Sequence, residues 1–285
     1  MISTSVIVPV HNGERHLSSL LESLTKQSLS EKWETIAVDN GSSDGSVAIL
    51  ERYKNRLPLT VIHASERRNL SFARNAGARV ARGRFLLFVD ADDALAAGYV
   101  EHMTRALADH ELVTSRVDSR SLNPEWVFLA HGEPWQAETI GVFFDFLPAA
   151  GSNIGIHRSD YERLGGFSEA LAGSEDIAFS WKAYKAGLRL HLVRDAIYQY
   201  RYRDSIAELY KQAANWGRSN VLLYATFRSE GMPGRSWSVT LRDWKTTGQA
   251  LLASRDAGSR ARAAVQLGYC VGRLRGSLRY GVRYL

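Results

Sequence analysis

The residues best suited to chemistry form one short run of carboxylates, Asp90-Ala91-Asp92-Asp93. The run directly follows Phe85-Leu86-Leu87-Phe88-Val89, whose composition is typical of a strand buried on both faces. Such a strand brings the residues after it to the sheet edge where open α/β sheets bind ligands. Carboxylates there can hold a hard cation such as Mg²⁺ or Mn²⁺, with phosphate oxygens supplying further ligands. The alternative is that Asp92 or Asp93 only caps the following helix.

Two further segments place polar groups at the same predicted edge. Asp39 ends a second expected strand, and its carboxylate can accept a hydrogen bond from a base or a ribose. The Asn40-Gly41 pair that follows can equally make a simple turn. Arg74 is expected on the first turn of a helix that should also end near this site, where its guanidinium could bind phosphate oxygens. The ordinary alternative for one helical Arg is a solvated face.

The elements that must position these residues follow from the hydrophobic pattern. Short apolar runs alternate with helical periodicity over residues 5–89, which predicts βαβ units around a mainly parallel sheet flanked by helices. Ser71 is expected to cap a helix that runs to Val80. The expected strands of this half are Ser5–Val10, Thr35–Val38, Leu59–His63 and Phe85–Val89.

The second half is less regular and ends in helices. We expect an α/β domain over residues 1–203 and a helical region over residues 204–285. The expected helices before Ser205 are Ala97–Ala108 and Asp176–Ala186, and the expected strands are Glu111–Val117, Glu125–Ala130, Asn153–His157, Arg189–Val193 and Ala196–Tyr202.

Composition limits the class of partner without choosing one. The chain of 285 residues has a net charge of +6, which favours a polyanion: a nucleic acid, an anionic membrane surface or a diphosphate. The single cysteine, Cys270, permits no internal disulfide and no Cys-x-x-Cys metal site, and a reducing, cytoplasmic location fits it. No segment has the sequence expected of a membrane-spanning helix.

Several ordered motifs together resemble the family 2 glycosyltransferases of GT-A fold. Any one motif could arise by chance, but they follow one another at the spacing of that family and extend over residues 3–203. They are Val6-Ile7-Val8-Pro9-Val10-His11-Asn12, Val38-Asp39-Asn40-Gly41-Ser42-Ser43-Asp44, Phe72-Ala73-Arg74-Asn75, Asp90-Ala91-Asp92-Asp93, Gly151-Ser152-Asn153-Ile154-Gly155, Leu164-Gly165-Gly166-Phe167 and Gly173-Ser174-Glu175-Asp176.

The resemblance implies an inverting, metal-dependent transferase that moves one sugar from a nucleoside diphosphate to a hydroxyl of a glycan or lipid-linked glycan. It implies that Asp92 ligates Mg²⁺ or Mn²⁺ and that Asp176, of the pair Glu175-Asp176, is the catalytic base. Acidic residues also favour helix N-termini, so the pair has a purely structural alternative. The resemblance further implies donor contacts from Pro9, Val10, Asn12, Asp39, Asn40, Arg74, Asp90 and Ala91.

Two departures from the family pattern bear on the donor. His11 stands where many members carry Tyr, and Asn40 replaces a frequent acidic residue, so UDP is favoured but not fixed. One rival is a nucleotidyltransferase, but Val8-Pro9-Val10-His11-Asn12 lacks the Gly-rich loop such enzymes need. A nucleic-acid-binding module is disfavoured because clustered carboxylates repel phosphate. A catalytically weak, sugar-nucleotide-binding homologue stays open.

The last 29 residues, 257–285, contain six Arg and no acidic residue. Their apolar side chains recur at helical spacing, as in a helix that lies on an anionic membrane surface. Peripheral contact at the inner face of the cell membrane would suit a lipid-linked acceptor. The equal alternative is a helix that packs on its own protein with a basic outer face. The apolar positions are Val271, Leu274, Leu278, Val282 and Leu285.

Overall fold

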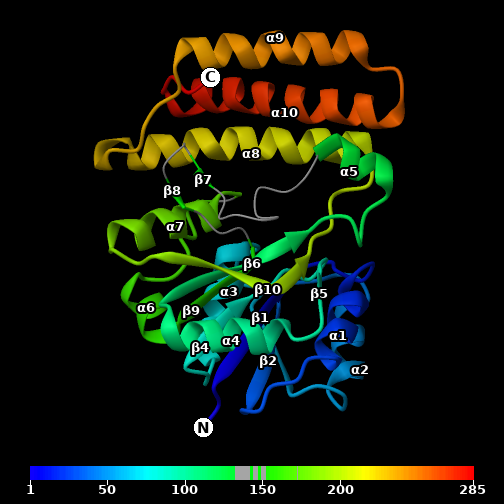
Figure 1. Cartoon of the computed structure of the whole chain (residues 1–285), viewed down its shortest axis with the longest axis vertical. Helices are drawn as coiled ribbons and strands as arrows, with labels where there is room; N and C mark the ends of the chain where they lie inside the picture. The colour runs from blue at the N-terminus through cyan, green and yellow to red at the C-terminus, as the bar shows by residue number, and fades with distance from the viewer. Residues whose placement is uncertain (132–141, 144–146, 149–151, 172) are drawn as a thin grey trace. The chain divides into compact units, whose positions relative to one another are not determined.

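The computed structural model describes residues 1–131, 142–143, 147–148, 152–171 and 173–285 (Figure 1). The chain forms two compact units. The first unit comprises Met1–Asp118, Trp135–Ala170 and Glu175–Tyr200, and the second comprises Ser119–Pro134, Leu171–Ser174 and Arg201–Leu285.

The first unit is built on an eight-stranded sheet of order β3-β2-β1-β4-β9-β6-β10-β5. Neighbours pair in parallel from β3 to β4 and again between β6 and β10, while β9 and β5 run antiparallel to their neighbours. The structure thus confirms a mixed, mainly parallel sheet. The strands are β1 Thr4–Val10, β2 Trp33–Asp39, β3 Leu59–His63, β4 Phe85–Phe88, β5 Ala94–Leu95, β6 Leu112–Asp118, β9 Ile154–His157 and β10 Leu190–Gln199; Val142–Phe143 (β7) and Leu147–Pro148 (β8) pair separately.

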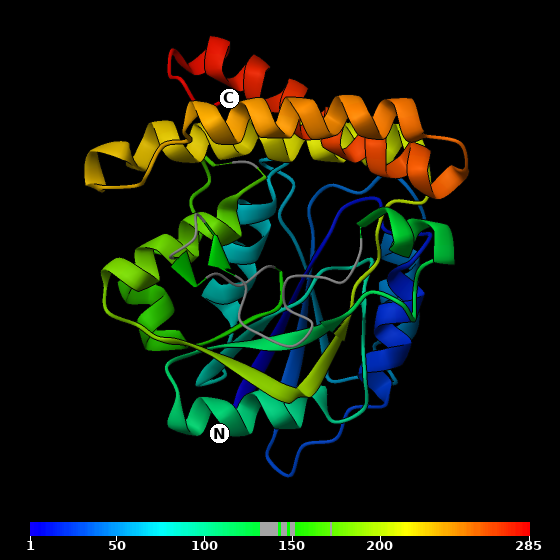
Figure 2. The same ribbon diagram turned by 45° about the horizontal axis from the view of Figure 1, so that its top comes forward.

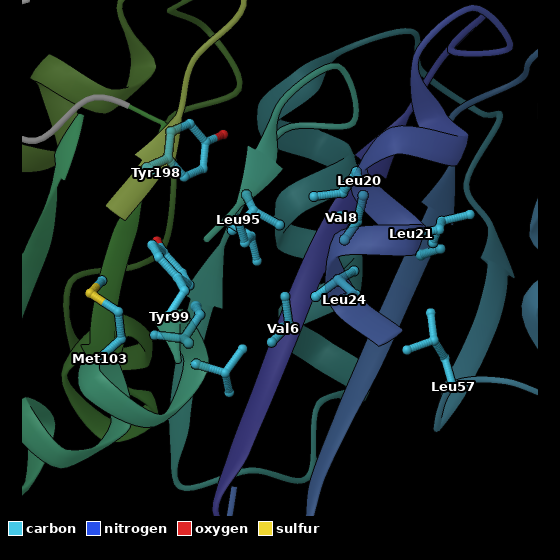
Figure 3. Packing of buried hydrophobic residues seen from close by; sticks show 14 of the residues in the cluster. Val6, Val8, Leu20, Leu21, Leu24, Leu57, Leu95, Tyr99, Met103 and Tyr198 are labelled. Carbon is cyan, nitrogen blue, oxygen red and sulfur yellow. The ribbon is translucent and has the colours of Figure 1, made fainter. Parts of the chain in front are cut away.

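Helices cover both faces of this sheet, and each face has its own apolar cluster. On one face the helices α1 (Leu17–Thr25), α2 (Ser46–Tyr53) and α4 (Tyr99–Asp109) pack on alternate residues of β1. Figure 3 shows Leu20 and Leu24 of α1 beside Val6 and Val8. On the other face lie α3 (Leu70–Val80), α6 (Arg158–Arg163) and α7 (Glu175–Lys185). Burial of β1 on both faces explains its continuous apolar sequence.

Three local predictions were wrong. The segment predicted as the strand Glu125–Ala130 is the helix α5 (Glu125–His131), because a short apolar run fits either element and here packs on a helix. Asn69, not Ser71, caps α3, and its side chain accepts from the Phe72 N–H at 3.0 Å. The two predicted strands after Gly187 are one strand, β10, with a register shift between Val193 and Ile197.

The second unit is an array of helices whose members α8 (Ile206–Phe227) and α10 (Ala257–Tyr280) pack side by side, while α9 (Trp237–Ala253) lies against α10 (Figure 2). Glycines at every fourth residue of α10 let the α8 and α10 backbones approach closely. A Cβ atom added at Gly268 would lie 2.6 Å from the Tyr210 carbonyl oxygen, and one at Gly272 would overlap the Ala214 carbonyl. The described helices include none with the length and apolarity needed to cross a bilayer.

This close approach predicts that Gly272→Ala destabilises the protein. The added methyl has no room against the α8 backbone, so the free energy of unfolding should fall by about 1–3 kcal/mol. Urea denaturation of the whole chain measures it. Gly248→Ala in α9 is the matched control, because a Cβ there meets no described atom within 4 Å and should stabilise the helix by up to about 1 kcal/mol. Equal effects of the two substitutions would contradict the packing described.

Candidate functional site

Parallel pairing brings the ends of three strands to one edge of the sheet. Val10 of β1 pairs with Asp39 of β2, and Ile7 of β1 pairs with Phe88 of β4. Asp39 is therefore the last residue of its strand, and Asp90 follows the end of β4 at the same edge. This is the edge at which open α/β sheets bind ligands.

A buried arginine joins two carboxylates at this edge. Arg74 of α3 is only 2 % exposed, so it does not lie on a solvated face. Its Nη2 donates to Asp90 Oδ1 at 2.7 Å, and its Nη1 donates to Glu175 Oε1 at 3.1 Å. The guanidinium carbon also lies 5.1 Å from the ring centre of Phe167. Burial alone would lower the pKa of Arg74, but Asp90 and Glu175 raise it above its ordinary value.

Asp176 lies beside this cluster at the start of α7. Glu175 is buried and bound to Arg74, whereas Asp176 is partly exposed and accepts from the Ile177 N–H at 2.8 Å. Burial and the neighbouring charge of Glu175 raise the pKa of Asp176 to about 7, despite the opposing effect of Arg74. A carboxylate with such a pKa can accept a proton near neutral pH.

A tyrosine from a distant strand fixes the carboxylate run after β4. The hydroxyl of Tyr198 in β10 donates to Asp93 Oδ2 at 2.6 Å and accepts from the Asp90 N–H at 3.0 Å. Burial first and the charge of Asp93 second raise the pKa of Tyr198 well above its usual value. Asp93 is thus directed into the protein, while Ala91 and Asp92 remain partly exposed.

Asp39 is held in its ionised form. It is 5 % exposed, accepts from the Ser42 N–H at 3.0 Å and lies 3.2 Å from His63 Nδ1. Burial opposes its ionisation, but the hydrogen bonds of Ser42 and His63 bring its pKa below the usual value.

The other predicted donor contacts differ in exposure. Pro9 and Val10 are buried in β1. Asn12 is exposed and has a left-handed backbone (φ 51°), and its side chain accepts from the Ser43 N–H at 2.8 Å. Asn40 is 4 % exposed and uses its amide within the fold. Its Nδ2 donates to the carbonyls of Ala64 and Arg67, and its Oδ1 accepts from the Asn69 N–H.

The described residues include no group of three or more His, Cys, Asp or Glu side chains arranged to hold a metal ion. Asp92 and Asp90 are both partly exposed; Asp90 is bound by Arg74, and the buried Asp93 is bound by Tyr198. A hard cation here would take one protein carboxylate, with the remaining ligands supplied by phosphate oxygens and water. That donor set is chemically sufficient for Mg²⁺ or Mn²⁺ when a diphosphate is bound.

Sequence reasoning missed two residues that position this site. Tyr198 lies more than a hundred residues from the aspartates it contacts, and nothing in its strand distinguishes it from a core aromatic. Asn75 accepts from the Tyr161 hydroxyl at 2.6 Å and donates to the Phe167 carbonyl at 3.0 Å, which holds the segment that covers Arg74. Asn75 lies beside Arg74 in the motif Phe72-Ala73-Arg74-Asn75, and this position is the only feature of the sequence that points to its role.

The raised pKa of Asp176 predicts a pH-dependent gain of stability in Asp176→Asn. Above about pH 7, ionised Asp176 lowers the free energy of unfolding. This destabilisation vanishes below the usual carboxyl pKa, because Asp176 is then protonated in both the folded and the unfolded chain. Urea denaturation should find the variant more stable than the native chain at pH 8, by on the order of 2 kcal/mol, and equal to it near pH 4. If the stability of Asp176→Asn relative to the native chain were lower at pH 8 than at pH 4, the raised pKa of Asp176 would be contradicted.

Comparison with known proteins identifies the family of the chain. Residues 5–165, more than half of the chain, match the family model described as Glycosyl transferase family 2. The poly(ribitol-phosphate) beta-N-acetylglucosaminyltransferase TarS of Staphylococcus aureus (strain MW2) is 27 % identical over 208 residues, which are 70 % of this chain and 35 % of TarS. The chain thus spans about a third of the length of TarS. The uncharacterized glycosyltransferase YibD of Escherichia coli (strain K12) is 29 % identical over 228 residues, 73 % of this chain and 64 % of YibD.

Solved structures share the fold. The mannosyltransferase PcManGT from Pyrobaculum calidifontis, in complex with GDP-Man and Mn²⁺, matches 96 % of this chain and 86 % of its own, with a TM-score of 0.66 and 20 % identity. A TarS fragment from S. aureus in complex with UDP-GlcNAc matches 100 % of this chain and 93 % of its own, with a TM-score of 0.55 and 19 % identity. Fold and family model agree, and the chain belongs to glycosyl transferase family 2.

Proposed function

We propose that the chain transfers a single sugar, with inversion, from a nucleoside diphosphate to a hydroxyl of a glycan or lipid-linked glycan. The observation that carries the proposal is the pair of ion pairs made by Arg74. The guanidinium of Arg74 binds Asp90, which follows strand β4 and is proposed to face the nucleotide. It also binds Glu175, which belongs to the predicted catalytic pair. A donor held at the first carboxylate would therefore lie close to a base at the second.

The donor is a nucleoside-diphosphate sugar, with UDP favoured. The exposed Asn12 and the ionised Asp39 would contact the nucleoside, together with the β1 backbone at Pro9 and Val10. Asp90 and Ala91 would face the ribose. Support comes from the fold neighbours, since TarS is known in complex with UDP and with UDP-GlcNAc, whereas PcManGT is known with GDP-Man.

Arg74 and Asn40 receive narrower roles in this proposal. Because Arg74 is buried and bound to two carboxylates, it would act on the reaction by positioning Asp90 and Glu175. Asn40 fixes the chain segment from Ala64 to Asn69, which carries the cap of α3, and so holds the helix on which Arg74 lies.

Asp92 would hold Mg²⁺ or Mn²⁺ together with the diphosphate. A bound divalent cation stabilises the negative charge that develops on the leaving diphosphate. Support for a metal comes from the partly exposed position of Asp92 and from the Mn²⁺ in the PcManGT complex.

Asp176 is the base in the proposed reaction. The acceptor hydroxyl attacks the anomeric carbon from the face opposite the diphosphate, and Asp176 takes its proton. A new C–O bond forms to the acceptor as the C–O bond to the β-phosphate breaks, so the configuration inverts. Glu175 is less suited to this task, because it is buried and Arg74 occupies one of its oxygens.

Two substitutions separate the proposed roles of Asp92 and Asp176. Asp92→Ala should abolish the enhancement of donor binding by Mn²⁺, because the protein ligand to the metal is lost. Asp176→Asn should keep Mn²⁺-dependent donor binding but lower sugar transfer by about 10²–10⁴-fold, because only proton removal is lost. Thermal shift with UDP-, GDP- and dTDP-sugars measures binding, and release of nucleoside diphosphate with an acceptor panel measures transfer.

Glu175→Gln serves as the comparison for Asp176→Asn within the pair. Full turnover of Asp176→Asn would place the base at Glu175 or remove the pair from the mechanism. Donor binding without transfer or donor hydrolysis by the native chain would instead identify a sugar-nucleotide-binding homologue. Donor binding that ignores both Mn²⁺ and Asp92→Ala would refute the metal role.

A further inference from the structure

The helix α9 has an apolar stripe exposed to solvent. Its first three members follow one another at spacings of four and three residues, and the last two are consecutive and lie two turns further along, so all five lie on one side of the helix. Leu241 is 66 % exposed and Leu252 is 90 % exposed, which is unusual for leucine within an ordered helix. The stripe comprises Trp237, Leu241, Trp244, Leu251 and Leu252.

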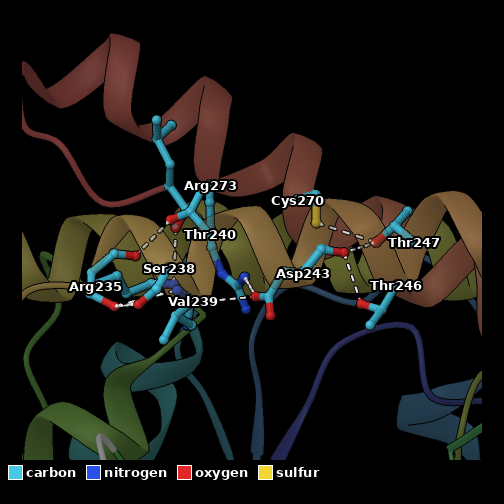
Figure 4. Close-up of polar contacts among 11 residues, drawn as sticks. Arg235, Ser238, Val239, Thr240, Asp243, Thr246, Thr247, Cys270 and Arg273 are labelled. Atoms are coloured by element: carbon cyan, nitrogen blue, oxygen red, sulfur yellow. Dashed lines mark hydrogen bonds and ion pairs between the residues drawn. The ribbon is translucent and has the colours of Figure 1, made fainter.

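The stripe is not the surface that attaches α9 to its unit. The buried Thr240 and Thr247 lie along one edge of the stripe, where α9 meets the rest of the unit. Thr247 Oγ1 lies 3.5 Å from Cys270 Sγ of α10, and Asp243 accepts from Arg273 Nη1 of α10 at 2.7 Å (Figure 4). Asp243 also binds Arg235. Since α9 is already held by these contacts, its apolar stripe is available to a partner outside the chain.

The surroundings of the stripe are strongly basic. Residues 231–285 contain ten Arg and Lys but only two acidic residues. Both acids are engaged within the unit, Asp243 with Arg235 and Arg273 and Asp256 as the N-cap of α10. The exposed cations make no ion pair with any residue that the structure describes; on α9 and at the end of the chain they are Arg242, Lys245, Arg275, Arg279 and Arg283.

We propose that α9 lies flat on an anionic lipid surface, with the stripe inserted at the level of the headgroups. A helix with a Trp- and Leu-rich side next to exposed Arg and Lys has the composition of an interfacial helix, and anionic headgroups attract the basic residues. A second copy of the chain is the weaker match, because two such surfaces would repel each other through their like charges. The lipid contact is made by α9 rather than by α10, whose glycine face is buried against α8.

The α10 helix also exposes two apolar side chains. Leu274 and Leu278 are 40 % and 78 % exposed, while Val282 is buried and Val271 is partly buried. The regularly spaced apolar residues of 257–285 therefore lie partly in the interior of the unit and partly on its surface. The proposal does not rest on the sugar-transfer mechanism, so either can fail alone.

Co-sedimentation of the full chain with vesicles tests the proposal. The chain should bind vesicles of mixed phosphatidylcholine and phosphatidylglycerol, bind much less to phosphatidylcholine alone, and lose binding as salt screens the charges. The double substitution Leu241→Ser with Leu252→Ser should weaken binding roughly tenfold or more, because two inserted side chains are lost. Arg242→Gln with Lys245→Gln should weaken it and reduce the preference for the anionic lipid.

Val80→Ser is the matched control, since Val80 is 48 % exposed at the end of α3, in the other unit, and should leave vesicle binding unchanged. Thermal unfolding of each variant shows whether it is folded. No binding by the native chain, equal binding to both vesicles, or unchanged binding by the folded Leu241/Leu252 variant would overturn the proposal. A dimer that this variant dissociates, without vesicle binding, would assign the stripe to a second copy of the chain.

Discussion

The buried guanidinium of Arg74 is the interaction on which the candidate site depends. A charge that is 2 % exposed is stable in the interior only when it is paired, and Arg74 is paired with carboxylates from two distant segments of the chain. Asp90 comes from the end of β4 and Glu175 from the start of α7. The need of the buried guanidinium for partners thereby fixes the position of α7, and with it Asp176, relative to the sheet edge.

Two other acidic side chains near this edge are stabilised by hydrogen-bond donors. Asp93 binds Tyr198, and Asp39 is stabilised by Ser42 and His63. Asp176 is the exception, because burial and its neighbour Glu175 oppose its ionisation. This difference between adjacent carboxylates separates a structural partner of arginine from a group that can exchange a proton near neutral pH. The cost is borne by the stability of the fold, as is common at functional sites.

Much of the fold and part of the site could be predicted from the sequence. Strand β1 is recognisable because burial on both faces makes it continuously apolar, and the residues after β2 and β4 reach one edge because parallel strands end together. The segment of α5 could not be assigned, since a seven-residue apolar run has no period of its own and its packing partner, α10, lies far along the chain. The role of Tyr198 could not be predicted from the sequence either, because it depends on contacts with the distant residues Asp90 and Asp93. The pairing of Arg74 with carboxylates, in place of solvent, also depends on tertiary burial that spacing cannot reveal.

A double-mutant cycle between Arg74 and Glu175 tests the central claim most directly. The free energy of unfolding is measured by urea denaturation for the native chain, Arg74→Met, Glu175→Gln and the double variant, with the exposed pair Arg105 and Glu101 as a reference. The buried pair should show a coupling energy of about 1–3 kcal/mol, against about 0.3–0.5 kcal/mol for the exposed pair. Additive effects of Arg74→Met and Glu175→Gln would show that the guanidinium does not hold the two segments together, and would contradict the account.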